Sequence, residues 1–295
     1  MFTDYVDEIL ISDPRENSLI SSNAHKRDEL DTYELCRLHR LWELKKVYHS
    51  QDDQRAVFKA AVQHYMRLVG DQTAIKLQIK GKYRTWGVPE VEGQRVYSQK
   101  GRADHLHQIK PAPIAHQLTR LYELLDTMST AVAAALEEVY SLGQTYPEIK
   151  EFEKIPGVGP VCAHLFDAFI QTPERFATKA KLWRYAQLSI TDRSSDGKPL
   201  GYQKLERSGI GALKSLSYCA WKAAASSGRS NEVRAFYEHS LRQTHDATHA
   251  RLNTQRKILS VMWSLWKHKE VYQPEIFSSS TKPVLVLPKK KVTDT

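Results

Sequence analysis

The sequence is poor in cysteine and has no long apolar run. Its 295 residues include three widely spaced cysteines, Cys36, Cys162 and Cys219, and no Cys-x-x-Cys pair. This usage argues against a disulfide framework or a zinc module, and we expect buried thiols in a reducing compartment. No apolar run approaches the roughly 18 residues of a membrane span, and an acidic N-terminus is not typical of a signal peptide. These features predict a cytoplasmic protein with no membrane partner.

Positive charge is in excess and is concentrated in one region. The chain has 43 Lys and Arg against 34 Asp and Glu, for a net charge of +9. Between Lys179 and Lys222 there are nine basic and three acidic residues, so six of those nine excess charges lie there. A hydrophobic content of 41% is enough for a packed core. A folded protein with such a basic region favours a polyanion as its partner.

Two long helices are predicted in the first half. Apolar residues at helical spacing indicate one helix over Asp52–Trp86, interrupted at Gly70, and another over Ile114–Leu142. The stretch between them, Gly87–Pro113, is rich in Gly, Pro and basic residues and is expected to be a loop-like insert. This pattern predicts an antiparallel helical hairpin, used for packing and oligomerisation or for contacts with a partner. Before it, Val6–Ser12 is expected to form a short buried strand.

The second half is also mainly helical in pattern. Thr172-Pro173-Glu174 is typical of a helix start, and a helical run extends from Asn231 to His268. His245 and His249 in that run are four residues apart and could bind a metal, but no third ligand is suitably spaced. Trp183 either stacks on bases or, as its size favours, packs in the core.

A short glycine-containing turn, Ile155-Pro156-Gly157-Val158-Gly159-Pro160, has the form of a helix–hairpin–helix turn. Glycine permits positive φ, and backbone N–H groups near a helix N-terminus suit a phosphate oxygen. Such a turn can equally do no more than join two helices. It is followed by a polar loop at Asp192–Lys198, then by Ser208-Gly209-Ile210-Gly211 and a helical run over Ala212–Trp221.

Two acidic residues lie near the N-terminus at helical spacing. Asp28 and Asp31 are three residues apart and so project from one face of a predicted helix that continues through Leu41. Two carboxylates so arranged can share a divalent cation through oxygen ligands. Acidic residues are also favoured in a first helical turn by the helix dipole alone, so the pattern leaves both interpretations open.

In this order, the motifs from Ile155 onward resemble the carboxy-terminal domain of the DEDD transposases of the insertion-sequence-one-ten family, which includes the Piv-like DNA invertases. The resemblance rests on Ile155–Pro160, Arg175-Phe176, Leu182–Leu188, the serine loop and Ser208-Gly209. The family usually has glycine where this chain has Gln187, and asparagine where it has Ile210.

This resemblance implies that Ser195 is the nucleophile on DNA, with the neighbouring Ser194 as the alternative. Nucleic-acid contacts are expected at a set of glycines and basic residues, namely Gly157, Gly159, Arg193, Lys198, Lys204 and Arg207. Lys26, Asp28 and Asp31 resemble the last two acids, with their preceding lysine, of a four-acid Mg²⁺ site on a resolvase-like RNase H fold. The first two acids have no counterpart here, so the chain is expected to be an N-terminally truncated member.

The expected fold is mainly α with a small α/β remnant. Four parts are expected: a truncated RNase H-like domain (1–50), a helical hairpin or coiled coil (51–150), a C-terminal transposase domain (151–273) and a flexible basic tail (274–295). The expected function is transposition or recombination of insertion-element DNA, with little activity from the chain alone. The alternative is a non-catalytic DNA- or RNA-binding remnant. Expected partners are DNA, a guide (bridge) RNA and further copies of the chain.

Overall fold

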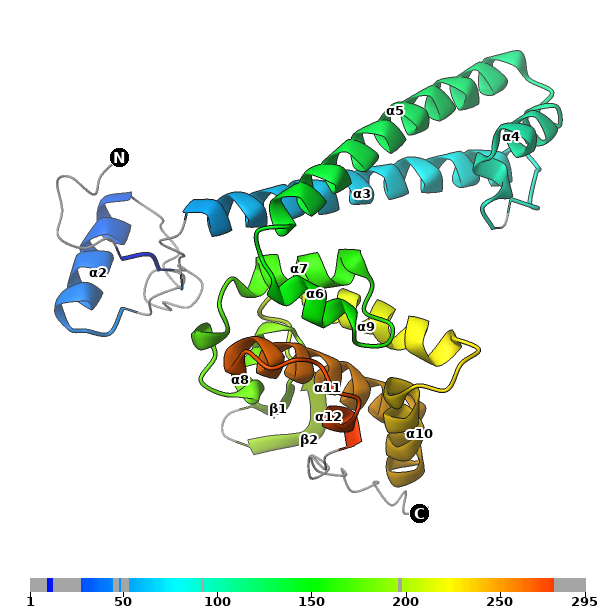
Figure 1. The fold of residues 1–295 in the computed structure, drawn as a ribbon. Coiled ribbons are helices and arrows are strands. Elements are labelled where there is room, and N and C mark those ends of the chain that lie inside the picture. The colour runs from blue at the N-terminus through cyan, green and yellow to red at the C-terminus, as the bar shows by residue number, and fades with distance from the viewer. Residues whose placement is uncertain are drawn as a thin grey trace, which may run out of the picture. The chain divides into compact units, whose positions relative to one another are not determined.

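The computed structural model describes residues 10–12, 28–44, 48, 53–91, 93–195 and 198–278, without the side chains of 192–203 and 278. The chain divides into two compact units, Met1–Asp53 and Gln54–Thr295, each of which is described by itself. Helices dominate both units, and the sheet within the described ranges has two strands, which confirms the expected mainly α class (Figure 1). None of the described helices is long and apolar enough to cross a membrane.

The first unit contains helix α2, Asp28–Arg40. Leu38 is its buried residue, at 4% exposure. Of the strand expected at Val6–Ser12, the structure describes the last three residues, and Ser12 forms a single bridge. Lys26 and the tail beyond Ser278 lie outside the described residues.

The second unit begins with the elements of the helical hairpin and continues into a helical domain. The elements are, in order, α3 (Asp53–Thr85), η2 (Arg95–Tyr97), α4 (Gln99–Leu106), α5 (Ala112–Gly143), α6 (Glu148–Glu153), α7 (Pro160–Ile170), η3 (Pro173–Arg175), α8 (Lys179–Tyr185), β1 (Ile190–Ser195), β2 (Lys198–Leu205), α9 (Gly211–Ser226), α10 (Glu232–Thr244), α11 (Ala247–His268) and α12 (Glu275–Ser278).

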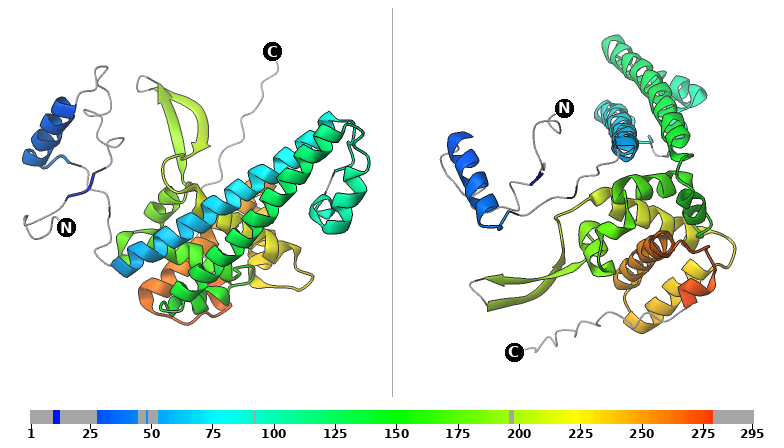
Figure 2. Two further views of the ribbon diagram at one scale, coloured as in Figure 1. Left: turned by 90° about the horizontal axis from the view of Figure 1, so that it is seen from above. Right: turned by 60° about the vertical axis from the view of Figure 1, so that its left-hand side comes forward.

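Helices α3 and α5 run antiparallel and end within two residues of the predicted limits (Figures 1 and 2). The expected interruption at Gly70 is wrong, because α3 passes through it without a break. A helical glycine costs only about 1 kcal/mol relative to alanine, which packing elsewhere along a long helix can offset. The insert between the helices is also not a plain loop, since it contains η2 and α4.

The hairpin packs into two separate hydrophobic clusters. The tip cluster joins Ile79 and Tyr83 of α3 to Leu118 and Tyr122 of α5, together with valines of the insert. At the other end, Phe58 of α3 belongs to the large core of the helical domain. The tip therefore has a core of its own.

A buried ionic group fastens α3 to the helical domain. The guanidinium of Arg55 pairs with Asp167 of α7, and it also pairs with Glu148 of α6 at 2.6 Å. The same guanidinium lies 3.7 Å from the ring centroid of Tyr146. Asp167 is completely buried. Burial raises the pKa of Asp167 well above its ordinary value, against the effect of Arg55 and with a contribution from Glu148.

Helix α11 is central to the domain, with an unbroken run of buried residues from Thr254 to Leu259. The predicted single helical run from Asn231 to His268 is wrong, because the chain breaks into α10 and α11 at His245. His245 has φ of 51°, in the left-handed region, and the side chain of Asp246 caps α11 by accepting a hydrogen bond from His249 N. His245 and His249 therefore do not form an i, i+4 pair on one helix.

The expected polar loop at Asp192–Lys198 is instead part of an antiparallel β-hairpin, which extends away from the helices (Figure 2). Alternation in Ile190–Ser195 is weak, so the strands gave no clear signal in the sequence. Thr172–Glu174 leads into one turn of 3₁₀ helix, and the α-helix begins later, after the cap at Thr178.

The expectation of buried thiols is wrong, because none of the three cysteines is fully buried. Cys36 and Cys219 are exposed, and Cys162 is half-buried; all three are free. Burial, with the nearby Cys219, raises the pKa of Cys162 to about 11, so this thiol stays protonated at neutral pH.

Candidate nucleic-acid interface

The turn between α6 and α7 is held by apolar anchors and one obligatory glycine. Ile155 and Val158 are buried, at 1% and 4% exposure. Gly157 has φ of +85°, and a Cβ there would lie 2.1 Å from the carbonyl oxygen of Ala220 and 2.8 Å from Ala224 N. Only glycine allows this conformation at this distance from α9. The turn is thus fixed against α9 through its backbone.

The other glycine of the turn has a different environment. Gly159 is exposed, is the N-cap of α7 with φ of −82°, and has no atom within 4 Å of the position of a Cβ. Pro160 follows at the first helical position, where its missing N–H is not needed. The N-terminus of α7 is therefore open to solvent at Gly159 and Pro160, and a helix N-terminus favours negative charge.

The serine-bearing hairpin is fixed at its base by the side chain of Gln187. This residue has φ of +56°, in the left-handed region that favours glycine. Its amide Nε2 donates to Arg207 O at 2.7 Å and to Gly209 O at 3.2 Å. The side chain of Gln187 thus joins the two ends of the hairpin.

Glu206 holds the turn on the other side of the hairpin. Its carboxylate accepts hydrogen bonds from Arg207 N at 2.9 Å, Ser208 N at 3.2 Å and the hydroxyl of Thr191 at 3.1 Å. The backbone donors of Ser208 and Arg207 lower the pKa of Glu206 to about 2. Glu206 therefore stays ionised through neutral and mildly acidic pH, and the backbone donors of this turn are already in use.

The segment leading into the hairpin is held from α11. Arg256 is 5% exposed, and its Nε donates to Leu188 O at 2.7 Å. Trp183 lies half-buried, and its Nε1 donates to Ser260 Oγ at 2.9 Å. Trp183 thus packs against α11, the more favoured of its two expected uses. Glu206 and Arg256 were not singled out in the sequence, and Gln187 was noted only as a departure from the pattern of the family that the chain resembles.

The predicted nucleophile lies at the far end of the hairpin. Ser195 pairs with Lys198 and Ser194 with Pro199, and the pairing shifts between Asp192 and Ser194, at Arg193. Asp196 and Gly197 lie outside the described residues, as do the side chains of Arg193 and Lys198. Near the base, Lys204 and Arg207 are exposed.

The predicted metal ligands belong to the first unit. Asp28 and Asp31 lie in the first turn of α2, Asp28 exposed and Asp31 half-buried. The Oδ1 atom of Asp31 is buried and has no hydrogen-bond partner among the described residues. Such an oxygen suits a cation ligand. In the part of the chain that the structure describes, no group of three or more His, Cys, Asp or Glu side chains is arranged to hold a metal ion.

The described domain is thus a helical body with an open helix N-terminus, exposed basic residues and a projecting β-hairpin. Residues 149–238 match the family model described as Transposase IS116/IS110/IS902 family. The match begins in α6 and ends in α10, so it contains the glycine turn, the hairpin and α9. No curated protein matches the chain. For residues 149–238 this match confirms the resemblance to IS110-type transposases seen in the sequence, and a transposase domain implies DNA as a partner.

Proposed function

We propose that this chain is a transposase or site-specific recombinase of insertion-element DNA, in which Ser195 is the nucleophile. The observation that carries the proposal is the position of Ser195 at the end of β1, within the family-matched range. The hairpin that bears it is held at its base by Gln187, Glu206 and Arg256. A fixed base can present the far end to a DNA strand in a defined orientation, which a catalytic group requires.

The proposed reaction is a transesterification. The Oγ of Ser195 attacks a backbone phosphorus, an Oγ–P bond forms, and the P–O bond to the adjoining sugar breaks. The hydroxyl proton passes to a base, and the departing sugar oxygen takes up a proton. A serine hydroxyl is a weak nucleophile at neutral pH and requires such activation. Mg²⁺, when bound, offsets charge on the phosphate. Ser194 is the neighbouring alternative as nucleophile.

Asp28 and Asp31 are the proposed ligands for that ion. The unpartnered Oδ1 of Asp31 supports this role. Two carboxylates hold Mg²⁺ only loosely, because the ion keeps most of its water when offered so few ligands. Two-ion catalysis on a phosphodiester needs several carboxylate oxygens. We therefore expect these 295 residues alone to bind DNA without cutting it.

DNA binding itself is proposed to combine the turn and the basic residues. The turn of Gly157 and Gly159, at the start of α7, suits a backbone phosphate. Arg193 and Lys198 flank the serine, and Lys204 and Arg207 extend the positive charge to the hairpin base. The α3–α5 hairpin is proposed to support assembly of further copies and contact with a guide RNA.

Binding is tested by titrating the purified chain with duplex DNA at several salt concentrations. Each phosphate contact should change the slope of log affinity against log salt by about −0.9. Arg207→Ala should weaken binding and reduce the slope by about one contact. Lys110→Ala, an exposed lysine between α4 and α5, is the matched control and should change neither. Affinity that does not depend on salt would contradict the electrostatic proposal.

Chemistry is tested with supercoiled DNA and Mg²⁺, by examining the products for nicks and for protein–DNA adducts. The expected result is bound but intact DNA. An adduct lost in Ser195→Ala and kept in Ser194→Ala would support the nucleophile and show that two acids suffice. The reverse pattern would move the nucleophile to Ser194. An adduct that survives both substitutions would contradict the serine mechanism. The alternative, a protein that binds nucleic acid without chemistry, shares the expected result and is excluded by an adduct that depends on Ser195 or on Ser194.

A further inference from the structure

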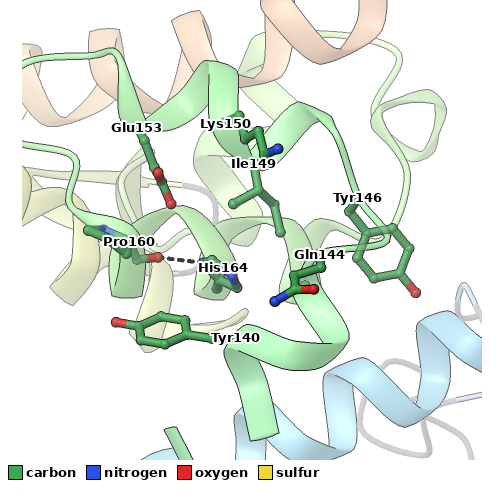
Figure 3. Close-up of a pocket in the computed structure, with 9 residues that line it drawn as sticks. Tyr140, Gln144, Tyr146, Ile149, Lys150, Glu153, Pro160 and His164 are labelled. Carbon is green, nitrogen blue, oxygen red and sulfur yellow. Dashed lines mark hydrogen bonds between the residues drawn. The ribbon is translucent and has the colours of Figure 1, made fainter. Parts of the chain in front are cut away.

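A pocket of about 320 Å³ lies where α5, α6 and α7 meet (Figure 3). The residues that matter for its chemistry are Tyr140, Gln144, Ile149, Lys150, Glu153 and His164. Ligand pockets in proteins begin at about 300 Å³ and combine apolar walls with a few polar groups. This pocket therefore has room for one small planar ring system.

Its walls are aromatic and apolar. The rings of Tyr140 and His164 lie edge to face, with centroids 4.9 Å apart and planes at 65°. Burial, with a contribution from Glu153, raises the pKa of Tyr140, so its hydroxyl remains a donor. His164 Nδ1 donates to Pro160 O at 2.8 Å, as the dashed line in Figure 3 shows. In the neutral ring this leaves Nε2 as an acceptor.

A glycine at the end of α5 makes room for the histidine. A Cβ at Gly143 would lie 2.3 Å from His164 Cδ2. The rest of the pocket edge is formed by three polar residues that are exposed, Gln144, Lys150 and Glu153. An amide and a carboxylate together offer both donors and acceptors to the edge of a heterocycle.

The pocket adjoins the turn that is proposed to hold a phosphate. Pro160 lines the pocket and is also the first residue of α7, immediately after Gly159. A ligand in the pocket and an anion at the start of α7 would therefore be neighbours. Nucleic acid joins a planar heterocycle to a phosphate within one unit, and Lys150 at the rim complements the phosphate charge.

We propose that the pocket binds one unpaired nucleobase of the nucleic acid whose backbone lies at the Ile155–Pro160 turn. This inference rests on the proposed function and extends it to the form of the substrate, which carries an unstacked base. Proteins that recognise unpaired bases use aromatic rings for stacking and polar side chains for the base edge. Tyr140 supplies the ring, and Glu153 accepts from an exocyclic amino group, as carboxylates do from cytosine.

The test compares the affinity of the full chain for two DNA duplexes, one fully paired and one with a single unpaired adenine, and for the matching RNA duplexes. Stacking of one base is expected to give about tenfold tighter binding of the bulged form. Tyr140→Leu should remove this preference while the affinity for the paired duplex stays unchanged. Tyr237→Leu, on α10 and outside the pocket, is the control and should keep the preference.

Because Tyr140 is partly buried, Tyr140→Leu could also disturb the fold, and a second variant at an exposed residue separates the two effects. Glu153 is exposed, so Glu153→Ala should keep the thermal midpoint and still reduce the bulge preference about threefold, by losing one polar contact. A preference seen with DNA alone or RNA alone supports the proposal and identifies the source of the base. Equal affinity for bulged and paired forms of both, or a preference that survives both substitutions, overturns it. Failure to bind any duplex would instead contradict the proposed function.

Discussion

The two glycine turns of the candidate interface both have a glycine packed closely against a backbone carbonyl, and they differ in the groups that anchor them. In the first turn, Ile155–Pro160, Gly157 approaches the carbonyl oxygen of Ala220; in the second, Glu206–Gly211, Gly209 approaches that of Tyr185. Both glycines have positive φ, +85° and +109°. The first turn is anchored by buried apolar side chains, whereas the second is anchored by hydrogen bonds to a carboxylate and an amide.

This difference separates two roles that the sequence pattern alone does not distinguish. In the second turn, Arg207 N and Ser208 N already donate to Glu206, so these backbone donors are not available to a phosphate, whereas the side chain of Arg207 remains exposed. The first turn leads directly into the exposed N-terminus of α7. We therefore interpret the first turn as the phosphate-binding element and the second as the support for the hairpin. The following predictions test that distinction, from the largest expected effect to the smallest.

The helix after the first turn depends on the buried ionic group. Arg55→Met should lower the free energy of unfolding by about 3–5 kcal/mol, because it leaves Asp167 and Glu148 without their cation. Urea denaturation measures this loss. The matched control is Arg95→Met, at the exposed pair with Asp104, which should cost no more than about 1 kcal/mol.

The loss in Arg55→Met should also depend on pH. The folded-state pKa of Asp167 is raised, so its contribution to stability is fully present below its ordinary pKa and is lost as pH rises through the folded value. Without Arg55 that pKa should rise further. The variant should therefore be closer to the native protein in stability at pH 4 than at pH 8. A loss equal at both values would show that Asp167 is not the affected group.

Both close-approach glycines should be intolerant of a side chain. Gly157→Ala and Gly209→Ala should each lower the free energy of unfolding by at least about 2 kcal/mol, because each combines positive φ with a Cβ about 2 Å from a carbonyl oxygen. Thermal and urea unfolding measure both. Gly228→Ala, with open space around the Cβ position, is the control. Tolerance at Gly209 alone would mean that the second turn is not rigid.

Glu206, which anchors the second turn, should contribute less to stability than the buried ionic group or the two glycines, and its contribution should be lost in acid. Glu206→Gln should destabilise the protein by about 1 kcal/mol at pH 7, a value discounted for partial exposure. The folded-state pKa of Glu206 is depressed to about 2, so its contribution is present above its ordinary pKa and is lost as pH falls through about 2. The stability difference between variant and native protein should therefore shrink between pH 5 and pH 2. If the stability difference does not shrink, the charge of Glu206 does not cause the destabilisation in Glu206→Gln.

The smallest effect on stability is expected at Gly159. Since φ is −82° and no atom lies within 4 Å of the Cβ position, Gly159→Ala should change the free energy of unfolding by less than about 0.5 kcal/mol. The added methyl group should still weaken DNA binding severalfold, since it lies where a phosphate would approach. Unchanged affinity would remove the first turn from the interface.

The sequence was sufficient for features set by local periodicity and turn chemistry. The limits of α3 and α5 follow from their apolar spacing, and the α6–α7 turn follows from its prolines and glycines. The hairpin was missed because polar residues such as Asp192 and Ser194 have weak strand preference, and its support comes from distant elements. The division at His245 was missed since a non-glycine residue in the left-handed region leaves no compositional mark.

In the candidate site, too, local sequence patterns predict some residues and miss those whose roles depend on distant contacts. Ser195, Lys204 and Arg207 were predicted from resemblance and charge, which a sequence records directly. The roles of Arg256 and Asp167 depend on contacts between residues 68 and 112 positions apart, with Leu188 and Arg55 respectively. No local pattern encodes such pairs. The pocket beside His164 was equally invisible, because its walls come from three helices.

The separate core at the tip of the α3–α5 hairpin would allow the length of the hairpin to change without a change in the helical domain. Because the tip cluster and the domain core are independent, the helical shaft between them acts as a spacer. Matched insertions of seven residues in both helices would move the tip outward by about 10 Å and leave both cores intact. The distance from the tip cluster to the helical domain could therefore change without any change in the residues of either core.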